Sequence, residues 1–137
     1  MKLVVDANIL FSFFKRKSFT RNFILNHPEI EYLLPVYVFD ELDKHKDIIM
    51  EKAGIDNKVY ELIVKELKDF VEILDIESFE DEWKRAKEIC PDPDDVHYFA
   101  VAMSEDCPLW TNDQKLSEQE EVKVIDTGEL VKLFGER

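Results

Sequence analysis

The run Lys2-Leu3-Val4-Val5-Asp6 begins the chain with an apolar stretch that ends on a carboxylate. A similar run, Pro108-Leu109-Trp110-Thr111-Asn112-Asp113, lies near the other end of the sequence. Short apolar runs bounded by polar residues are typical of strands buried in a parallel sheet. Asp6 and Asp113 would then both lie at the carboxyl edge of that sheet, where open α/β folds place their ligands.

Between these two runs, strand-like and helix-like segments alternate. Strands are expected at residues 2–6, 31–34, 71–76, 109–111 and 122–125. Strands that alternate with helices favour an α/β fold, in which helices cover both faces of a parallel sheet. The sequence has no internal repeat and no linker rich in Gly, Pro or Ser that would divide it.

Capping residues and prolines set the expected helix boundaries in the first half of the chain. Ser18 is expected to cap a helix that stops near Pro28. Pro35 is well placed as the first residue of a long helix that runs toward Gly54, a suitable C-terminal cap. Glu41 would lie in the second turn of that helix.

Four further helices are expected in the second half. Asp56 is expected to cap a helix whose buried face repeats with helical period, at Val59, Leu62, Ile63, Leu67 and Phe70. Ser78 is expected to cap a helix over residues 79–89, a helix should restart at Asp95 after two prolines, and the last helix should span residues 127–134.

Length and composition indicate one domain. With 137 residues, 45% of them hydrophobic, the chain can enclose one sizeable core, so we expect a single domain over residues 1–137. No stretch approaches the roughly 20 apolar residues of a membrane span. Asp6 and Asn8 interrupt the apolar start, which does not fit a signal peptide. We therefore expect a cytoplasmic protein with no membrane partner.

The cysteines and histidines do not indicate a zinc site. The two cysteines, Cys90 and Cys107, lack CxxC spacing and are expected to be reduced. The three histidines, His27, His45 and His97, lack the paired spacing of a metal-binding helix and are expected at the surface or partly packed.

The charge is strongly negative but unevenly distributed. A net charge of −13 argues against a broad nucleic-acid-binding surface, because phosphate affinity comes mainly from Lys and Arg. Residues 1–28 nevertheless carry five basic residues against Asp6 alone, so they hold +4 and the remainder holds −17. Lys15, Arg16, Lys17 and Arg21 are candidate contacts to RNA. A solvated connection between helices explains the same residues equally well.

Four acidic residues stand where strands should end or helices begin: Asp6, Glu41, Asp95 and Asp113. Any of the three aspartates could simply cap its own helix. Capping does not explain Glu41, which is expected inside a helix. If the four carboxylates meet, their repulsion raises their proton affinity unless a hard cation such as Mg²⁺ or Mn²⁺ is bound. One or two such ions could activate a water for phosphodiester hydrolysis.

Four motifs in order resemble a PIN domain of the VapC-like toxin ribonuclease family. They are Val4-Val5-Asp6-Ala7-Asn8, Glu41-Leu42, Asp92-Pro93-Asp94-Asp95-Val96 with Phe99-Ala100-Val101-Ala102, and Trp110-Thr111-Asn112-Asp113. The resemblance covers nearly the whole chain. It implies a three-layer α/β/α fold with a central, mainly parallel sheet of four to five strands. It also implies an endonuclease that cleaves RNA with Mg²⁺ or Mn²⁺ and frequent homodimers, and it raises the possibility of an antitoxin partner.

The resemblance also assigns roles to residues. Asp6, Glu41, Asp95 and Asp113 match the family's catalytic metal ligands. Asn8 matches a polar residue that orients the first Asp, and Thr111 a hydroxyl residue that supports the last one. Asp92 and Asp94 are expected to add water-mediated contacts, because the alanines that follow Asp95 favour it as the direct ligand.

Two other functions remain as alternatives. One is a catalytically silent PIN-like module that binds RNA or a protein. The other, a phosphatase of the haloacid dehalogenase type, is disfavoured because Asp6-Ala7-Asn8 lacks the second Asp of such enzymes. A face for self-association is expected from part of the aromatic cluster near the start of the chain, Phe11, Phe13, Phe14, Phe19 and Phe23.

Overall fold

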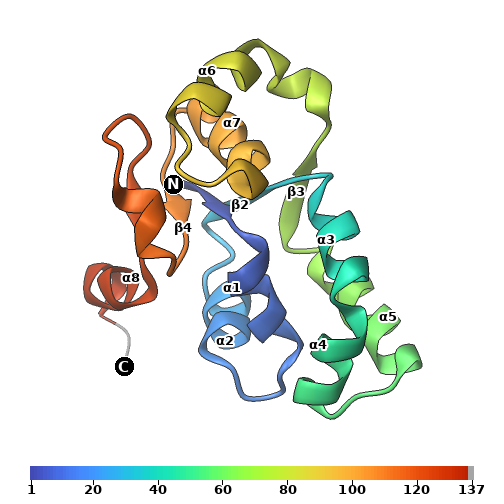
Figure 1. Cartoon of the computed structure of the whole chain (residues 1–137). Helices are drawn as coiled ribbons and strands as arrows, with labels where there is room; N and C mark the ends of the chain where they lie inside the picture. Colours follow the sequence, from blue (N-terminus) through green and yellow to red (C-terminus); the bar gives the residue numbers. More distant parts are fainter. Residues whose placement is uncertain (136–137) are drawn as a thin grey trace.

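The computed structural model describes residues 1–135, which form one five-stranded parallel sheet with helices around it (Figure 1). The strands lie in the order β3-β2-β1-β4-β5. Their bounds are β1 Lys2–Val5, β2 Glu31–Pro35, β3 Val71–Leu74, β4 Leu109–Trp110 and β5 Val124–Ile125. β1 is the central strand and pairs with β2 on one side and β4 on the other.

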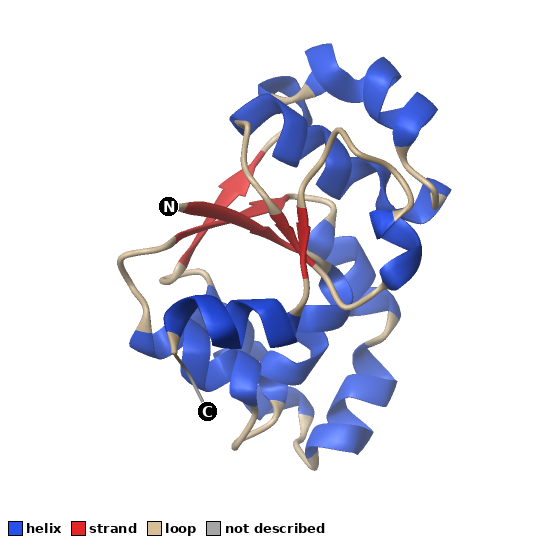
Figure 2. Ribbon diagram, turned by 90° about the vertical axis from the view of Figure 1, so that its left-hand side faces the viewer, coloured by secondary structure: helices blue, strands red, loops and turns tan. Residues whose placement is uncertain are grey.

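Helices lie on both faces of the sheet (Figure 2). The α-helices are α1 Ala7–Phe11, α2 Phe19–Asn26, α3 Val38–Lys44, α4 Lys46–Ala53, α5 Asn57–Leu67, α6 Trp83–Ile89, α7 Val96–Glu105 and α8 Thr127–Phe134. Short 3₁₀ helices are η1 Ser12–Phe14, η2 Ile76–Ser78, η3 Glu80–Glu82, η4 Pro93–Asp95 and η5 Gln114–Ser117. The expected three-layer α/β/α fold with a parallel sheet is confirmed.

The central strands are buried on both faces. Leu3, Val4 and Val5 of β1 are fully buried, as are the apolar side chains of β4. α7 packs against β1, β2 and β4, and its small Ala100 has no exposed surface. Strands covered on both faces read as continuous apolar runs, which is why the opening motif could be recognised in the sequence.

Several expected helix ends are confirmed. Ser18 accepts a hydrogen bond from the Arg21 amide, and Asp56 accepts one from the Val59 amide. Gly54 ends α4 in the left-handed region at φ 68°, where a residue without a side chain is least strained. The last helix spans the expected residues 127–134.

The prediction of one long helix from Pro35 to Gly54 was wrong. Pro35 instead ends β2, where it pairs with Leu74 and lies beyond the last residue pair that β2 makes with β1. Its missing N–H therefore costs no ladder hydrogen bond. The helix starts at Val38 and is interrupted at His45, so Glu41 lies in the first turn of α3 and not in a second turn.

Two other helix predictions need correction. Ser78 does not cap a helix over residues 79–89, because Ser78 itself ends η2 and a second 3₁₀ helix, η3, follows before α6 begins at Trp83. The buried face of α5 is also rotated from the expected one. Val59 is 37% and Leu62 57% exposed, whereas Tyr60 is 1% exposed and fills the core together with Leu67.

The aromatic cluster near the start of the chain serves the core. Phe13, Phe14 and Phe23 are buried, and Phe11 and Phe19 are half-buried and pack against the core. That a part of the cluster forms a self-association face stays a prediction. Both cysteines are free thiols, as expected. No helix within residues 1–135 is long and apolar enough to cross a membrane.

Candidate active site

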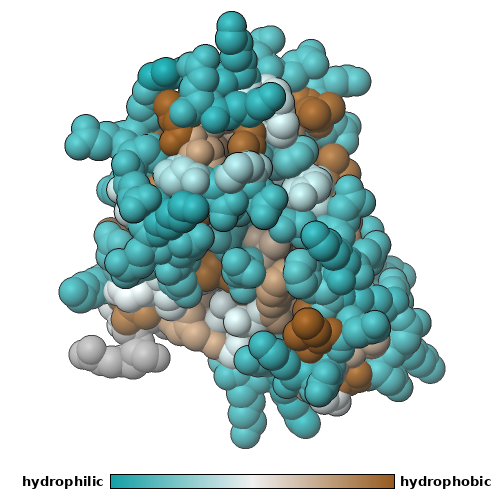
Figure 3. All heavy atoms as spheres, in the orientation of Figure 1, coloured by the Kyte–Doolittle hydropathy of each residue, from teal (hydrophilic) through white to brown (hydrophobic). Residues whose placement is uncertain are grey.

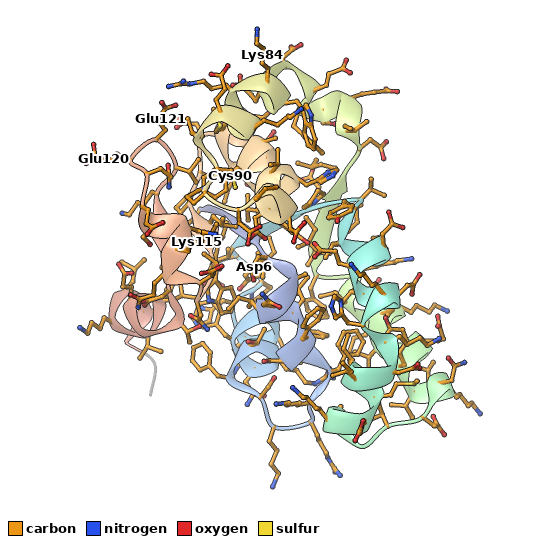
Figure 4. The ribbon with its side chains drawn as sticks, viewed as in Figure 1. Asp6, Lys84, Cys90, Lys115, Glu120 and Glu121 are labelled. Atoms are coloured by element: carbon orange, nitrogen blue, oxygen red, sulfur yellow. The ribbon has the colours of Figure 1, made fainter. Side chains whose placement is uncertain are left out.

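The order in which strands are added to the sheet reverses between β1 and β4. From β1 the chain proceeds through β2 to β3 on one side, and then returns to add β4 and β5 on the other. Ligands of open α/β sheets bind outside the carboxyl ends of the strands at such a switch point. Asp6 follows β1 and Thr111 follows β4, so both stand at this position, and Figure 4 shows Asp6 near the centre of the molecule.

Asp6 is a buried carboxylate, only 2% exposed. Its Oδ1 accepts a hydrogen bond of 2.9 Å from the Ile9 amide, which caps α1. It also accepts a hydrogen bond from the side chain of Thr111. Burial raises the pKa of Asp6 to about 6, despite these two hydrogen bonds, and the charges of Glu41 and Asp113 add to the rise.

Thr111 connects two of the acidic residues. Its side chain is 1% exposed and bonds to Asp6, while its Oγ1 accepts a 3.1 Å hydrogen bond from the Asp113 amide. The Asp113 carboxylate in turn accepts a 3.0 Å hydrogen bond from the Lys115 amide and caps η5. Thr111 therefore fixes the position of Asp113 relative to Asp6.

Three carboxylates lie close enough to share one cation. Asp92, Asp95 and Asp113 each offer an oxygen, and these oxygens lie within 4.8 Å of one another. All three side chains are half-buried. We call these residues the acidic triad. Burial raises the pKa of Asp95 to about 7, and the charges of Asp6 and Asp92 contribute further.

The turn between α6 and α7 carries three aspartates and determines which of them belong to the triad. Asp92 Oδ1 accepts a 3.0 Å hydrogen bond from the Asp94 amide and begins η4, and Asp95 then precedes α7 with no capping bond from its side chain. Asp94 is exposed and lies outside the triad. Asp92, expected only in a water-mediated role, thus offers an oxygen within 4.8 Å of Asp113, as Asp95 does.

Glu41 approaches the site from α3 without joining the triad. The Tyr98 hydroxyl, on a side chain without exposed surface, donates a 2.5 Å hydrogen bond to Glu41 Oε1. Burial raises the pKa of Glu41, and the bond from Tyr98 opposes that rise. The sequence motifs did not single out Tyr98. Its spacing of three residues from Asp95 could have identified it, because residues three apart share a helix face.

The family follows from a comparison with known proteins. A family model described as the PIN domain matches residues 4–128. The chain belongs to the PIN-domain family. The resemblance to a PIN domain found in the sequence motifs is therefore confirmed.

A solved structure shares the fold of this PIN domain. A chain in the crystal structure of VapBC2 from Rickettsia felis, bound to a DNA fragment from their promoter, is similar with a TM-score of 0.67 and 15% sequence identity. The similarity covers 92% of this chain and 98% of that chain. No curated protein matches this PIN domain.

The other candidate residues of the PIN domain lie further from the triad. Asn8 is exposed on α1 and, within residues 1–135, makes no hydrogen bond to Asp6, which is held by Ile9 and Thr111 instead. Lys15, Arg16 and Lys17 are exposed beyond η1. α1 and η1 separate them from Asp6 by roughly 13 Å of helix rise.

Arg21 is engaged elsewhere. It forms a 2.6 Å ion pair with Glu66, and its guanidinium lies 5.1 Å from the centre of the Phe13 ring. Its side chain is 20% exposed. Of the four basic residues singled out from the sequence, Arg21 is therefore the one least able to reach a ligand.

The triad fits a hard divalent cation. It offers only oxygen ligands, which Mg²⁺ and Mn²⁺ prefer. The raised pKa of Asp6 and Asp95 means that their charged forms lack compensation from the protein. A bound cation would supply that compensation.

Proposed function

We propose that this PIN domain is an endoribonuclease that depends on one or two Mg²⁺ or Mn²⁺ ions. The observation that supports it best is the acidic triad, placed at the switch point of the sheet beside the buried Asp6. Asp6, Asp92, Asp95 and Asp113 would hold the metal, with Asp92 as a direct ligand. When bound, the metal would lower the pKa of a water and stabilise the charge that develops on phosphate oxygens.

The residues of the chain divide the remaining work. Thr111 would orient Asp6 and Asp113, because it bonds to both. Glu41 has Oε1 occupied by Tyr98. Its Oε2 would accept a proton from the attacking water, a task suited to a carboxylate whose pKa is raised by burial.

Cleavage by pure protein tests this function. The wild type should cut single-stranded RNA when Mg²⁺ or Mn²⁺ is added and stop when EDTA is added. Asp113→Asn should lose at least a hundredfold in rate, because it removes one ligand of the triad. Asp69→Asn, which removes an exposed carboxylate far along the chain from the triad, is the matched control and should keep full activity.

Calorimetric titration with Mn²⁺ separates this enzyme from a silent binding module. The nuclease should take up Mn²⁺ in the wild type and lose that uptake in Asp113→Asn. Absence of metal uptake by the wild type, together with intact RNA, would refute the catalytic proposal.

We further propose that the domain is the toxin of a toxin–antitoxin pair and acts in the cytoplasm. The similar chain comes from a VapBC2 structure that is bound to promoter DNA. A partner with basic side chains would find complementary charge on a protein of net charge −13. Co-expression with the product of an adjacent gene, followed by purification through one partner, tests the pairing.

A homodimer remains a prediction. The aliphatic side chains exposed on α5, Val59 and Leu62, are candidates for its interface in place of the buried phenylalanines. Sedimentation of the wild type and of Leu62→Glu should then show a dimer only for the wild type.

A further inference from the structure

A groove lies between α1 with η1 on one side and α4 on the other. Its volume is about 420 Å³, and its lining includes Asn8, Phe11, Lys15, His45, Ile48 and Lys52. We call it the basic groove. Figure 3 shows the same face of the molecule, with strongly hydrophobic side chains exposed among the hydrophilic surface over the lower ends of these helices.

Both walls of the groove begin beside the site. On one wall, Asn8 lies two residues after Asp6 on α1. On the other, His45 follows α3, and its Nδ1 is 3.0 Å from the carbonyl oxygen of Glu41. The walls then proceed to Lys15 and Lys52 at the far end. Each wall of the groove therefore adjoins one acidic residue of the site, Asp6 on one side and Glu41 on the other, and the groove is roughly 13 Å long, judged from the rise of α1 and η1.

The charge of the groove is opposite to that of the protein. No carboxylate is among its lining residues, although the net charge is −13. Within residues 1–135, neither Lys15 nor Lys52 forms an ion pair. A basic peptide would be repelled here, whereas a polyanion would find two free ammonium groups.

The middle of the groove offers aromatic and apolar surface. The rings of Phe11 and His45 lie 5.1 Å apart at 45°. Ile48 is 53% exposed at the rim. Grooves that combine free basic groups with aromatic rings are typical of sites for single-stranded nucleic acid, where bases stack and phosphates meet cations.

We propose that the basic groove binds the single-stranded RNA segment that flanks the scissile phosphate. Lys15 and Lys52 contact successive phosphates, and Phe11 with His45 contacts a base. This inference rests on the proposed function for the cleaved phosphate itself. It adds Phe11, His45 and Lys52 to the substrate contacts and places Lys15 at the end of a defined path.

Binding can be measured separately from cleavage. The probe is a fluorescein-labelled single-stranded RNA of twelve nucleotides and mixed sequence, followed by anisotropy in the Asp113→Asn background. Lys15→Ala with Lys52→Ala should weaken binding by about 25-fold at 0.1 M salt, since each phosphate contact to single-stranded RNA accounts for roughly fivefold. The salt slope of log K should fall by about 1.4 for two contacts.

Matched variants complete the test. Lys58→Ala with Lys84→Ala removes the same charge from exposed positions outside the groove. This control pair should leave both the RNA affinity and the salt slope within twofold of the parent. Figure 4 shows Lys84 at the opposite end of the molecule from the lower ends of α1 and α4. Phe11→Leu keeps an apolar side chain but removes the ring, and should weaken binding roughly fivefold or more.

Three outcomes decide the proposal. A selective loss in the groove variants supports it, even if the wild type then fails to cleave RNA, so its result is distinct from that of the nuclease assay. Equal losses of RNA affinity in the groove pair and the control pair would show that binding depends only on the overall charge, and would overturn the proposal. An unchanged RNA affinity in the groove pair, or no RNA binding by the Asp113→Asn parent, would also overturn the proposal. A protein partner would then be the alternative ligand of the groove.

Discussion

Replacing Asp95 with Asn should stabilise the metal-free protein at neutral and alkaline pH. Asp95 precedes α7 and makes no capping hydrogen bond through its side chain, so Asn removes the charge without removing a cap. Burial and the neighbouring carboxylates raise the pKa of Asp95 from 3.8 to about 7. Three pKa units correspond to about 4 kcal/mol. Because the side chain is only half-buried and screened by solvent, we expect about 2 kcal/mol.

The sign of the pH dependence follows from the raised pKa. The folded protein binds a proton at Asp95 more tightly than the unfolded chain does, so protonation favours the fold. Wild-type stability should therefore fall as pH rises from about 4 to about 7, while the variant lacks this contribution. The difference in free energy of unfolding should be near zero at pH 4 and reach its full value above pH 7.

Urea unfolding in EDTA at a series of pH values measures this difference. Addition of Mn²⁺ at pH 8 should make the wild type more stable than Asp95→Asn. A free Mn²⁺ concentration of 100 times Kd adds about 2.7 kcal/mol to the free energy of unfolding of a protein that binds the ion. Asp94→Asn is the matched control, since Asp94 is exposed and outside the triad. If Asp95→Asn were no more stable than the wild type at pH 8 without metal, the electrostatic account of the site would be wrong.

Three further predictions concern individual side chains and protons. Asp92→Asn should weaken Mn²⁺ binding at least tenfold in calorimetric titration whereas Asp94→Asn should not, because only Asp92 belongs to the triad; equal effects would contradict this assignment. Tyr98→Phe removes the hydrogen bond to Glu41 that lowers the pKa of this carboxyl, so it should lower the free energy of unfolding in urea by about 2 kcal/mol above pH 7 and raise the pH at which the cleavage rate reaches half its maximum. Tyr60→Phe is the control and should be nearly neutral, because it deletes a buried hydroxyl that has no partner within residues 1–135. Mn²⁺ affinity should fall as pH drops below about 7, because protons compete at Asp95 and then at Asp6; a pH-independent affinity between pH 5 and 8 would argue against both as ligands.

The sequence was most informative where function and local structure coincide. Asp6 directly follows the fully buried residues Leu3, Val4 and Val5, and its short-range capping bond to Ile9 needs no knowledge of the tertiary fold. Asp113 could be placed for the same reason, as it follows β4 closely. Parallel strands bring their carboxyl ends to one edge, so the proximity of these two acids could be predicted from pattern alone.

Other features depend on the tertiary structure. The choice among Asp92, Asp94 and Asp95 is made by the 3₁₀ turn of η4, which points Asp94 outward. The partnership of Tyr98 with Glu41 joins α7 to α3 across 57 positions of sequence. The break at His45 is also not indicated by helix propensity; there the ring Nδ1 of His45 lies 3.0 Å from the Glu41 carbonyl oxygen, which also accepts the His45 amide. Local patterns cannot encode such contacts.

The bond from Thr111 to Asp6 has a consequence for the timing of synthesis. Asp6 leaves the ribosome 105 residues before Thr111, whose hydroxyl orients it, and 107 residues before the Asp113 carboxylate. A nascent chain therefore cannot assemble the centre before residue 113 has been made. The nuclease proposed above would in this way be unable to cut the transcript that encodes it until that point of synthesis.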